Sequence, residues 1–141
     1  MIPTADFFEH TADLGLRIVA EDPSGLFRAA AEKLFDCIVA NRDEVEPREV
    51  ETVELRTDSI EDLFLAWLNE LIFRCETRHR LYSRFDVTVS ADLRALNGTI
   101  AGEPIDATKH VLDHEVKAAT RHGLLLEKTE EGWKAEVIVD I

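Results

Sequence analysis

Alternating apolar and polar positions predict the first strand of the chain over residues 13–20. Leu14, Leu16 and Ile18 take every second position there, as in a strand with one buried face. The residues before this strand read as an irregular entry segment. A second strand is predicted over residues 50–57, after a charged loop that contains a proline. Both strands are therefore expected to lie with one face on a core.

Apolar residues that recur at three- and four-residue steps predict two amphipathic helices, over residues 24–39 and 59–77. Ser59 precedes Asp62 by three positions, which is the pattern of a helix-capping box. The aromatic stripe of the second helix either lines a groove for a partner or packs in the core, and we favour the core. The two stripes consist of Phe27, Ala30, Ala31, Leu34, Phe35 and Ile38, and of Ile60, Leu63, Phe64, Trp67, Leu68, Leu71, Ile72 and Cys75.

The last third of the chain is rich in strand patterns. Asn97-Gly98 is typical of a hairpin turn, and residues 102–110 read as an irregular segment. Two strand–helix units followed by short strands predict an α+β fold. We expect a single domain over residues 1–141, in which two amphipathic helices pack on a mainly antiparallel β-sheet as an α/β sandwich. The short strand-like runs cover residues 85–89, 99–101, 115–121, 124–128 and 133–140.

Composition narrows the classes of function. The chain has 141 residues, with 16 basic and 29 acidic side chains and a net charge of −13. Stable direct binding to nucleic acid is not expected, because that affinity comes from clustered Lys and Arg. No apolar run is long enough to span a bilayer, and the first residues lack the pattern of a signal peptide. These features predict a cytoplasmic protein with no membrane partner.

Motifs of stand-alone enzymes are missing from the sequence. It holds no GxSxG elbow, phosphate-binding loop, GxGxxG or HExxH pattern. Cys37 and Cys75 lie 38 positions apart without metal-ligand spacing, so we interpret them as ordinary buried thiols. We expect a protein that is not an enzyme.

Several acidic and imidazole side chains allow two interpretations each. Glu103 and Asp106 are either an acid–base pair or solvated loop carboxylates, and the acidity of the chain favours the second. His110 and His114 would share a face only on a helix, whereas their segment reads as loop passing into strand. A zinc site at this pair is therefore disfavoured.

Carboxylates at the two ends of the chain are a stronger signal. Asp13 begins the first predicted strand, and a strong strand pattern runs through Asp140 to Ile141, which would hold the terminal carboxylate in place. If the first and last strands are neighbours, these three carboxylates meet and require a cation. Oxygen ligands favour Ca²⁺, or Mg²⁺ with retained waters. The alternative is that Asp13 marks a strand start and Asp140 an exposed end.

Lys117 is a second candidate contact. Period two places Glu115 and Lys117 on one face of the predicted strand over residues 115–121. The lysine either contacts a partner or an anion, or forms a cross-strand pair with a neighbouring acid, and we favour the pair.

The sequence resembles the archease family over nearly its whole length and in order. Any single matching fragment is weak, whereas together they are specific. The fragments that carry the resemblance are Phe8-Glu9-His10-Thr11-Ala12-Asp13 with Leu16, residues 26–31, residues 67–72, Gly102-Glu103, Asp106, His110, residues 115–120, His122 and residues 133–141.

The resemblance implies a metal site and a partner. In that family a metal ion, observed as calcium, is bound at positions that correspond to Asp13, Asp140 and Ile141. Archeases activate the RtcB-type RNA ligase of tRNA splicing and RNA repair, promoting its guanylylation and its multiple turnover, and are not themselves catalytic. The resemblance therefore predicts this ligase as partner, with His10, Glu115 and Lys117 as further contacts.

The sequence leaves two other functions open. One is a general chaperone or scaffold for nucleic-acid-modifying enzymes, which would act without a metal ion. The other is an independent metal-dependent hydrolase, which needs a water-activating base near the carboxylates. His10 is the only candidate base nearby in the sequence.

Overall fold

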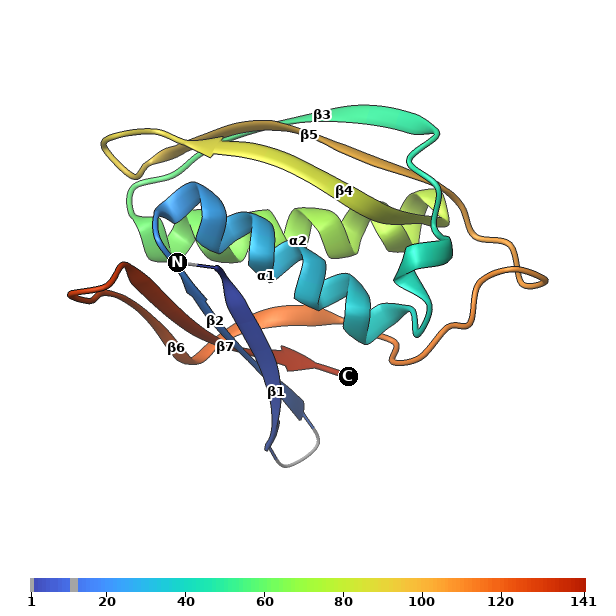
Figure 1. Cartoon of the computed structure of the whole chain (residues 1–141), viewed down its shortest axis with the longest axis horizontal. Coiled ribbons are helices and arrows are strands. Elements are labelled where there is room, and N and C mark those ends of the chain that lie inside the picture. Colours follow the sequence, from blue (N-terminus) through green and yellow to red (C-terminus); the bar gives the residue numbers. More distant parts are fainter. Residues whose placement is uncertain (1, 11–12) are drawn as a thin grey trace.

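Two α-helices lie between two antiparallel β-sheets in the computed structural model of the chain (Figure 1). The structure describes residues 2–10 and 13–141, apart from the side chains of residues 9 and 10. This arrangement confirms the predicted α+β class, and the strands form two sheets instead of one. The four-stranded sheet has the order β1 (Thr4–His10), β2 (Asp13–Ala20), β7 (Trp133–Asp140), β6 (Ala118–Lys128), and the three-stranded sheet has the order β3 (Glu49–Arg56), β5 (Ala95–Pro104), β4 (Arg80–Val89).

The helices begin and end close to their predicted bounds. Helix α1 covers Pro23–Ile38 and helix α2 covers Ile60–Arg78, with a short 3₁₀ turn η1 at Arg42–Glu44. The Ser59 hydroxyl accepts a hydrogen bond from the Asp62 N–H at 3.1 Å, so the predicted cap is confirmed. Neither of the helices in the described part of the chain is long and apolar enough to cross a membrane.

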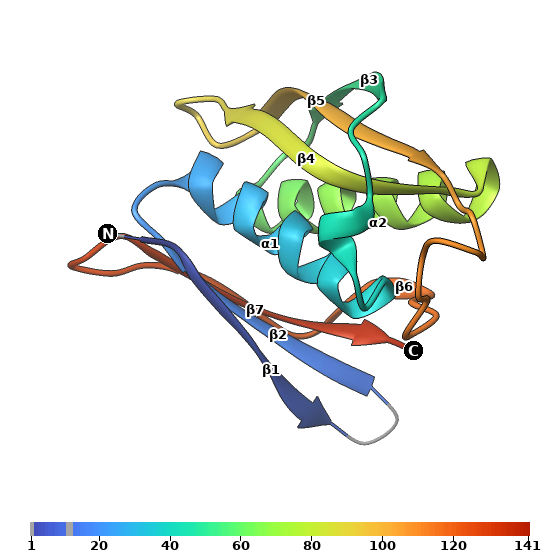
Figure 2. The ribbon, with the colours of Figure 1, turned by 45° about the vertical axis from the view of Figure 1, so that its right-hand side comes forward.

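The apolar stripes of both helices form the core between the sheets. Trp67 is fully buried, and its ring Nε1–H donates to the main-chain oxygen of Phe27 at 2.9 Å, which ties the two helices together. Phe27 and Phe64 meet edge to face at a centroid distance of 5.1 Å. The aromatic stripe of α2 is thus core packing and not a partner groove. Figure 2 shows α1 and α2 covered by one sheet on each side.

The N-terminal segment is a strand, where an irregular segment was expected. Strand β1 pairs antiparallel with β2 from Thr4↔Val19 to His10↔Asp13. The prediction failed because the adjacent Phe7 and Phe8 hide the alternation. Lys33 Nζ lies 3.7 Å from the centroid of the Phe7 ring, whereas the Phe8 ring covers Gly15 on the opposite face of the sheet. A side chain at Gly15 would collide with that ring.

The predicted hairpin turn at Asn97-Gly98 is wrong. Both residues lie inside β5, and the chain turns between Val89 and Ala95, where Leu93 adopts a φ of 64°. Gly98 is needed for close approach, because a Cβ there would lie 2.4 Å from the main-chain oxygen of Asp86.

Two strands predicted in the C-terminal third are one strand in the structure. The runs over residues 115–121 and 124–128 join as β6, which begins only at Ala118. A register shift between Thr120 and Leu125 interrupts the pairing of β6 with β7, and this irregularity produced the apparent break in the sequence pattern.

The cap of α2 supplies a test of the fold. Replacing Ser59→Ala should lower the free energy of unfolding by about 1 kcal/mol, because the Asp62 N–H loses its acceptor at the helix start. Urea unfolding measures this change. The control is Thr77→Ala in the exposed last turn of α2, which should stay within about 0.5 kcal/mol of the wild type. Equal stability of Ser59→Ala and the wild type would contradict the capping role.

Candidate metal centre

Asp13 and Asp140 face each other across neighbouring strands. Strands β2 and β7 pair antiparallel, and Asp13 is the register partner of Asp140. Directly opposed residues project from the same face of a sheet, with Cβ atoms about 4.5–5.5 Å apart. Leu16 and Val137, an odd number of positions away in each strand, are fully buried against the helices. The two aspartates therefore project from the outer face, where both are half-buried.

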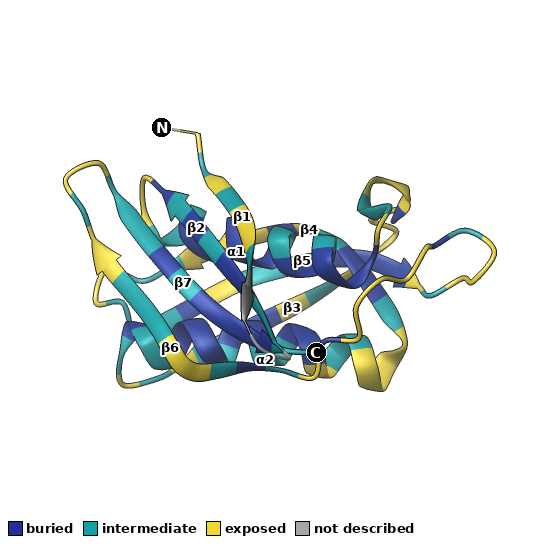
Figure 3. Ribbon diagram, turned by 90° about the horizontal axis from the view of Figure 1, so that it is seen from below, coloured by how far each residue is buried: buried dark blue, intermediate teal, exposed yellow. Residues whose placement is uncertain are grey.

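The last residues of the chain are held by main-chain and side-chain contacts. Asp140 lies between Asp13 on β2 and its register partner Ala118 on β6. The N–H of Lys117, just before β6, donates to the main-chain oxygen of Asp140 at 2.8 Å. The side chain of Ile141 packs against the core. Figure 3 shows the sheet from outside, with β2 and β7 between the outer strands β1 and β6 and the C-terminus at one end of the sheet. Ile141 follows Asp140 directly and so stands at the same end of the sheet as the Asp13–Asp140 pair.

This donor set suits a hard cation. Opposed carboxylates destabilise a strand pair unless a positive charge compensates them. Within residues 2–10 and 13–141, Asp140 forms no ion pair with a Lys or Arg. Side-chain and main-chain carboxylates are all-oxygen ligands of the kind that Ca²⁺ and Mg²⁺ take. No three His, Cys, Asp or Glu side chains of the described residues gather around one point, so the third ligand would be the main-chain carboxylate of Ile141.

The structure places the further candidate contacts, His10, Glu115 and Lys117, only in part. His10 is the register partner of Asp13 in β1, but its side chain lies outside the description, as do Thr11 and Ala12 of the same motif. Glu115 and Lys117 are exposed and precede β6, so the predicted strand over residues 115–121 does not place them. Lys117 reaches the site through its main-chain N–H, and in the described residues its side chain forms no cross-strand ion pair.

The chain matches one protein family over nearly its whole length. The model of the archease protein family (MTH1598/TM1083) matches residues 6–141. The chain belongs to the archease family. It is 36% identical to the archease of Methanopyrus kandleri over 94% of this chain and 96% of that protein, and 34% identical to the archease of Pyrococcus abyssi over 96% and 97%.

Solved structures of the family share the fold. The solution structure of protein 1598 of Methanobacterium thermoautotrophicum superposes with a TM-score of 0.79 at 30% identity, over 97% of this chain and 98% of that one. The crystal structure of a Thermotoga maritima archease, described as a possible chaperone, gives a TM-score of 0.68 at 21% identity, over 95% and 94%. The second likeness concerns the fold alone.

A buried polar cluster that sequence reasoning missed lies at Glu103. This residue is 5% exposed, and its Oε2 accepts hydrogen bonds from Glu46 N–H at 2.9 Å, Lys109 Nζ at 2.8 Å and His110 Nε2 at 2.9 Å. His110 Nδ1 accepts from the Asp106 N–H at 2.9 Å, so the imidazole proton is on Nε2. Glu103 is thus neither a solvated carboxylate nor a partner of Asp106 in acid–base chemistry.

These contacts shift the pKa of Glu103. Burial alone would raise it, but the hydrogen bonds from Lys109, the Glu46 N–H and His110 outweigh burial and lower the pKa from 4.5 to about 2. The only signal in the sequence was that Glu103, Lys109 and His110 lie close together along the chain. This spacing does not predict their contact unless the path of the loop between them is known.

The remaining histidine and cysteine candidates are separate. His110 is buried in the Glu103 cluster, whereas the side chain of His114 is 43% exposed, so they do not form a zinc pair. Cys37 is buried and Cys75 half-buried, and both are free thiols. Burial raises the pKa of each thiol to about 11, which makes both poor nucleophiles near neutral pH.

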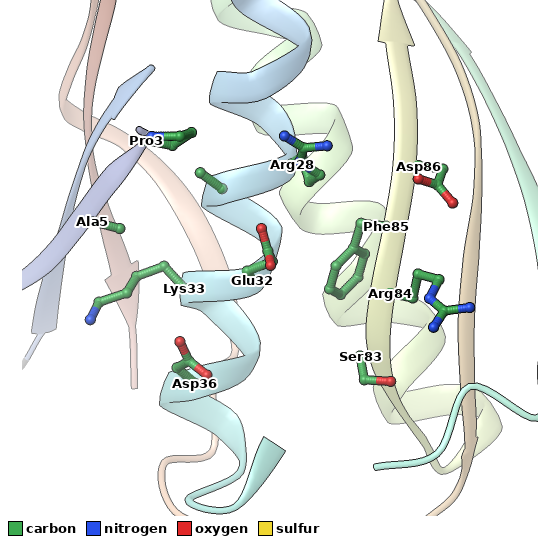
Figure 4. A pocket seen from close by; sticks show the side chains of 11 residues that line it. Pro3, Ala5, Arg28, Glu32, Lys33, Asp36, Ser83, Arg84, Phe85 and Asp86 are labelled. Atoms are coloured by element: carbon green, nitrogen blue, oxygen red, sulfur yellow. The ribbon is translucent and has the colours of Figure 1, made fainter. Parts of the chain in front are cut away.

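A groove of about 810 Å³ lies between β1 and β4, with α1 as its floor (Figure 4). Its lining carries charges of both signs, with Arg28, Lys33 and Glu32 on α1 and Asp86 on β4. Its lining includes neither Asp13 nor Asp140. The candidate metal centre is therefore a feature of the sheet's end and not of this groove.

The Glu103 cluster predicts a pH dependence of stability. Because the pKa of Glu103 is lower in the folded chain than its ordinary 4.5, its stabilisation is complete above that pH and is lost as the pH falls toward 2. Between pH 6 and pH 2 the wild type should lose roughly 1–2 kcal/mol more unfolding free energy than Glu103→Gln, allowing for solvent screening around Lys109. Urea unfolding at several pH values measures it.

The control for this charge change is Glu54→Gln, on an exposed position of β3. Its loss of stability with falling pH should parallel that of the wild type. If Glu103→Gln also parallels the wild type, the buried carboxylate does not contribute as described.

Proposed function

We propose that this archease family member is an accessory activator of an RtcB-type RNA ligase, which promotes guanylylation and multiple turnover of the ligase through a cation held by Asp13, Asp140 and the Ile141 carboxylate. The observation that carries the proposal is the register pair Asp13↔Asp140 at the end of a sheet whose chain belongs to this family. The pairing joins strands from opposite ends of the sequence, and two acidic side chains at opposed positions support a shared cation site.

The residues at this end hold and orient the ion. Asp13 and Asp140 contribute side-chain oxygens from adjacent strands, and the Lys117 N–H and the buried side of Ile141 limit movement of the chain end. A bound divalent cation supplies a concentrated positive charge that attracts phosphate oxygens. His10, Glu115 and Lys117 are the proposed contacts with the ligase.

Overall charge suits a protein partner with a basic surface. A net charge of −13 is attracted to the positive cleft in which an RNA ligase holds its substrate. The proposed division of work follows: the ligase contributes catalytic groups and RNA contacts, and the acidic chain acts on the ligase in the cytoplasm without binding RNA stably.

A general chaperone or scaffold is the second candidate, and the description of the Thermotoga maritima relative as a possible chaperone favours it. Such a protein would act on unrelated clients by covering surfaces. It would also tolerate loss of Ile141, whereas the activator requires the terminal carboxylate.

Product formed per ligase molecule tests the activator proposal. Limiting RtcB-type ligase is supplied with GTP and a broken RNA, and with the wild-type chain, Asp13→Ala or no addition. Many turnovers are expected with the wild type, and about one or fewer with Asp13→Ala or with no addition, because one ligand of the cation is lost.

Asp86→Ala is the matched control, because Asp86 is an exposed acid on β4 in the other sheet. It should activate as the wild type does. Absence of enhancement by the wild-type chain with its cognate ligase would contradict the proposed function. Full activation by a folded Asp13→Ala variant would contradict the role of the cation.

A further inference from the structure

Asn69 is a polar residue in the middle of the otherwise apolar inward part of α2. Asparagine is disfavoured in helix interiors, because its side chain competes for main-chain hydrogen bonds. Here the carboxamide forms its hydrogen bonds with β6 and not with the main chain of its own helix. Its Oδ1 accepts from the Ala119 N–H at 2.9 Å, and its Nδ2 donates to the Ala119 main-chain oxygen at 3.1 Å.

This double hydrogen bond replaces a strand partner. Strand β6 is the outer strand of its sheet, with β7 on one side. The main-chain groups of Ala119 would otherwise have to find water, although Ala119 is only 6% exposed. The Asn69 carboxamide satisfies both groups and so fixes the position of the first residues of β6 relative to α2.

Those first residues hold the acidic end of β7. Ala118 is the register partner of Asp140, and the Lys117 N–H donates to the Asp140 main-chain oxygen at 2.8 Å. Asn69, Ala119, Lys117 and Asp140 thus form a short series of contacts from the core to the candidate metal centre. Movement of β6 away from α2 would pull on the strand that carries Asp140.

We propose that Asn69 is a positioning residue for the Asp13–Asp140 centre, acting through Ala119 and Lys117. The proposal rests on the proposed function for the identity of the ligand, a divalent cation. Its structural part, that Asn69 determines how firmly Lys117 holds Asp140, stands on the contacts alone.

Asn41 provides an independent parallel at the other end of the same connecting segment. Its Nδ2 donates to the Lys109 main-chain oxygen at 3.0 Å, and its Oδ1 accepts from the Val111 N–H at 2.8 Å. The carboxamides of Asn41 and Asn69 therefore form hydrogen bonds with the main chain on either side of residues 112–118. The segment that reaches the candidate metal centre is thus held at one end by Asn41, which follows α1, and at the other by Asn69 on α2.

Two measurements on the isolated chain test the proposal. Amide hydrogen exchange at Lys117 and Ala119 should become roughly tenfold faster in Asn69→Leu, because the loss of the carboxamide frees the start of β6. Titration with calcium alone should show affinity about 10–100-fold weaker than in the wild type, as for loss of a group that orients a ligand.

Two control variants separate positioning from loss of stability. Asn97→Leu changes an exposed asparagine of β5 and should leave both measurements unchanged. Trp67→Phe removes the bond to Phe27 and destabilises the core, but it should leave calcium affinity unchanged while the chain is folded. Asn69→Asp keeps an acceptor for the Ala119 N–H and places an anion against the Ala119 oxygen, so it should behave like Asn69→Leu.

Unchanged exchange at Lys117 in folded Asn69→Leu would overturn the proposal. Faster exchange with unchanged calcium affinity would equally overturn it, because Asn69 would then serve stability only. A wild-type chain that binds no calcium would contradict the cation site of the proposed function and, with it, the positioning of that site by Asn69. Calcium binding by the wild type together with unchanged affinity in folded Asn69→Leu would contradict the positioning role alone.

Discussion

The antiparallel pairing of β2 with β7 is the constraint on which the rest of the molecule depends. Alternate residues of these two central strands face the helices, and most of them are buried there, as with Leu16 and Val137. A shift of the register by one residue would move this apolar set to the solvent face and the aspartates into the core. The same burial energy that aligns the strands therefore sets Asp13 opposite Asp140. The carboxylate pair is therefore a consequence of core packing, which outweighs the repulsion between the two aspartates.

Polar side chains fix the connection between β5 and β6, which strand pairing alone does not hold. The connection between β5 and β6 leaves the three-stranded sheet at the Glu103 cluster, passes the end of α1 and reaches the acidic end of β7. Along this path the Asn41 and Asn69 carboxamides bind main-chain groups, and the end of α1 accepts from the Asp113 and His114 N–H groups. Glu103 holds the same connection through the side chains of Lys109 and His110, so a largely irregular segment is fixed at several points.

Much of the fold was predictable, since helix periodicity is a local property. The two helices and the cap at Ser59 follow from apolar steps and one short motif. Strand β1 was missed because Phe7 and Phe8 pack on opposite faces of one strand, which destroys the alternation. Asn97-Gly98 misled because the glycine allows close approach of β4 and does not make a turn.

The candidate site was predictable only in part. Asp13, Asp140 and Ile141 could be named from the chain, but their meeting was conditional on which strands are neighbours, and the β2–β7 register supplies that condition. The Glu103 cluster could not be foreseen, because burial of this carboxylate depends on donors from two other segments, at Glu46 and at Lys109 and His110, that converge on it only in the fold. Asn69 lies within residues 67–72, one of the fragments that resemble the archease family. The helical periodicity does not predict that its side chain forms hydrogen bonds with β6.

Paramagnetic broadening by Mn²⁺ tests the central claim most directly, because it locates a bound cation without reference to activity. Substoichiometric Mn²⁺ is added to isotope-labelled chain, and loss of amide signal is followed along the sequence. The account predicts that broadening centres on Asp13, Asp140 and Ile141, and that excess Ca²⁺ reverses it. Broadening centred on other acidic residues, such as Glu49 and Glu51 on β3, or no localised broadening, would contradict it.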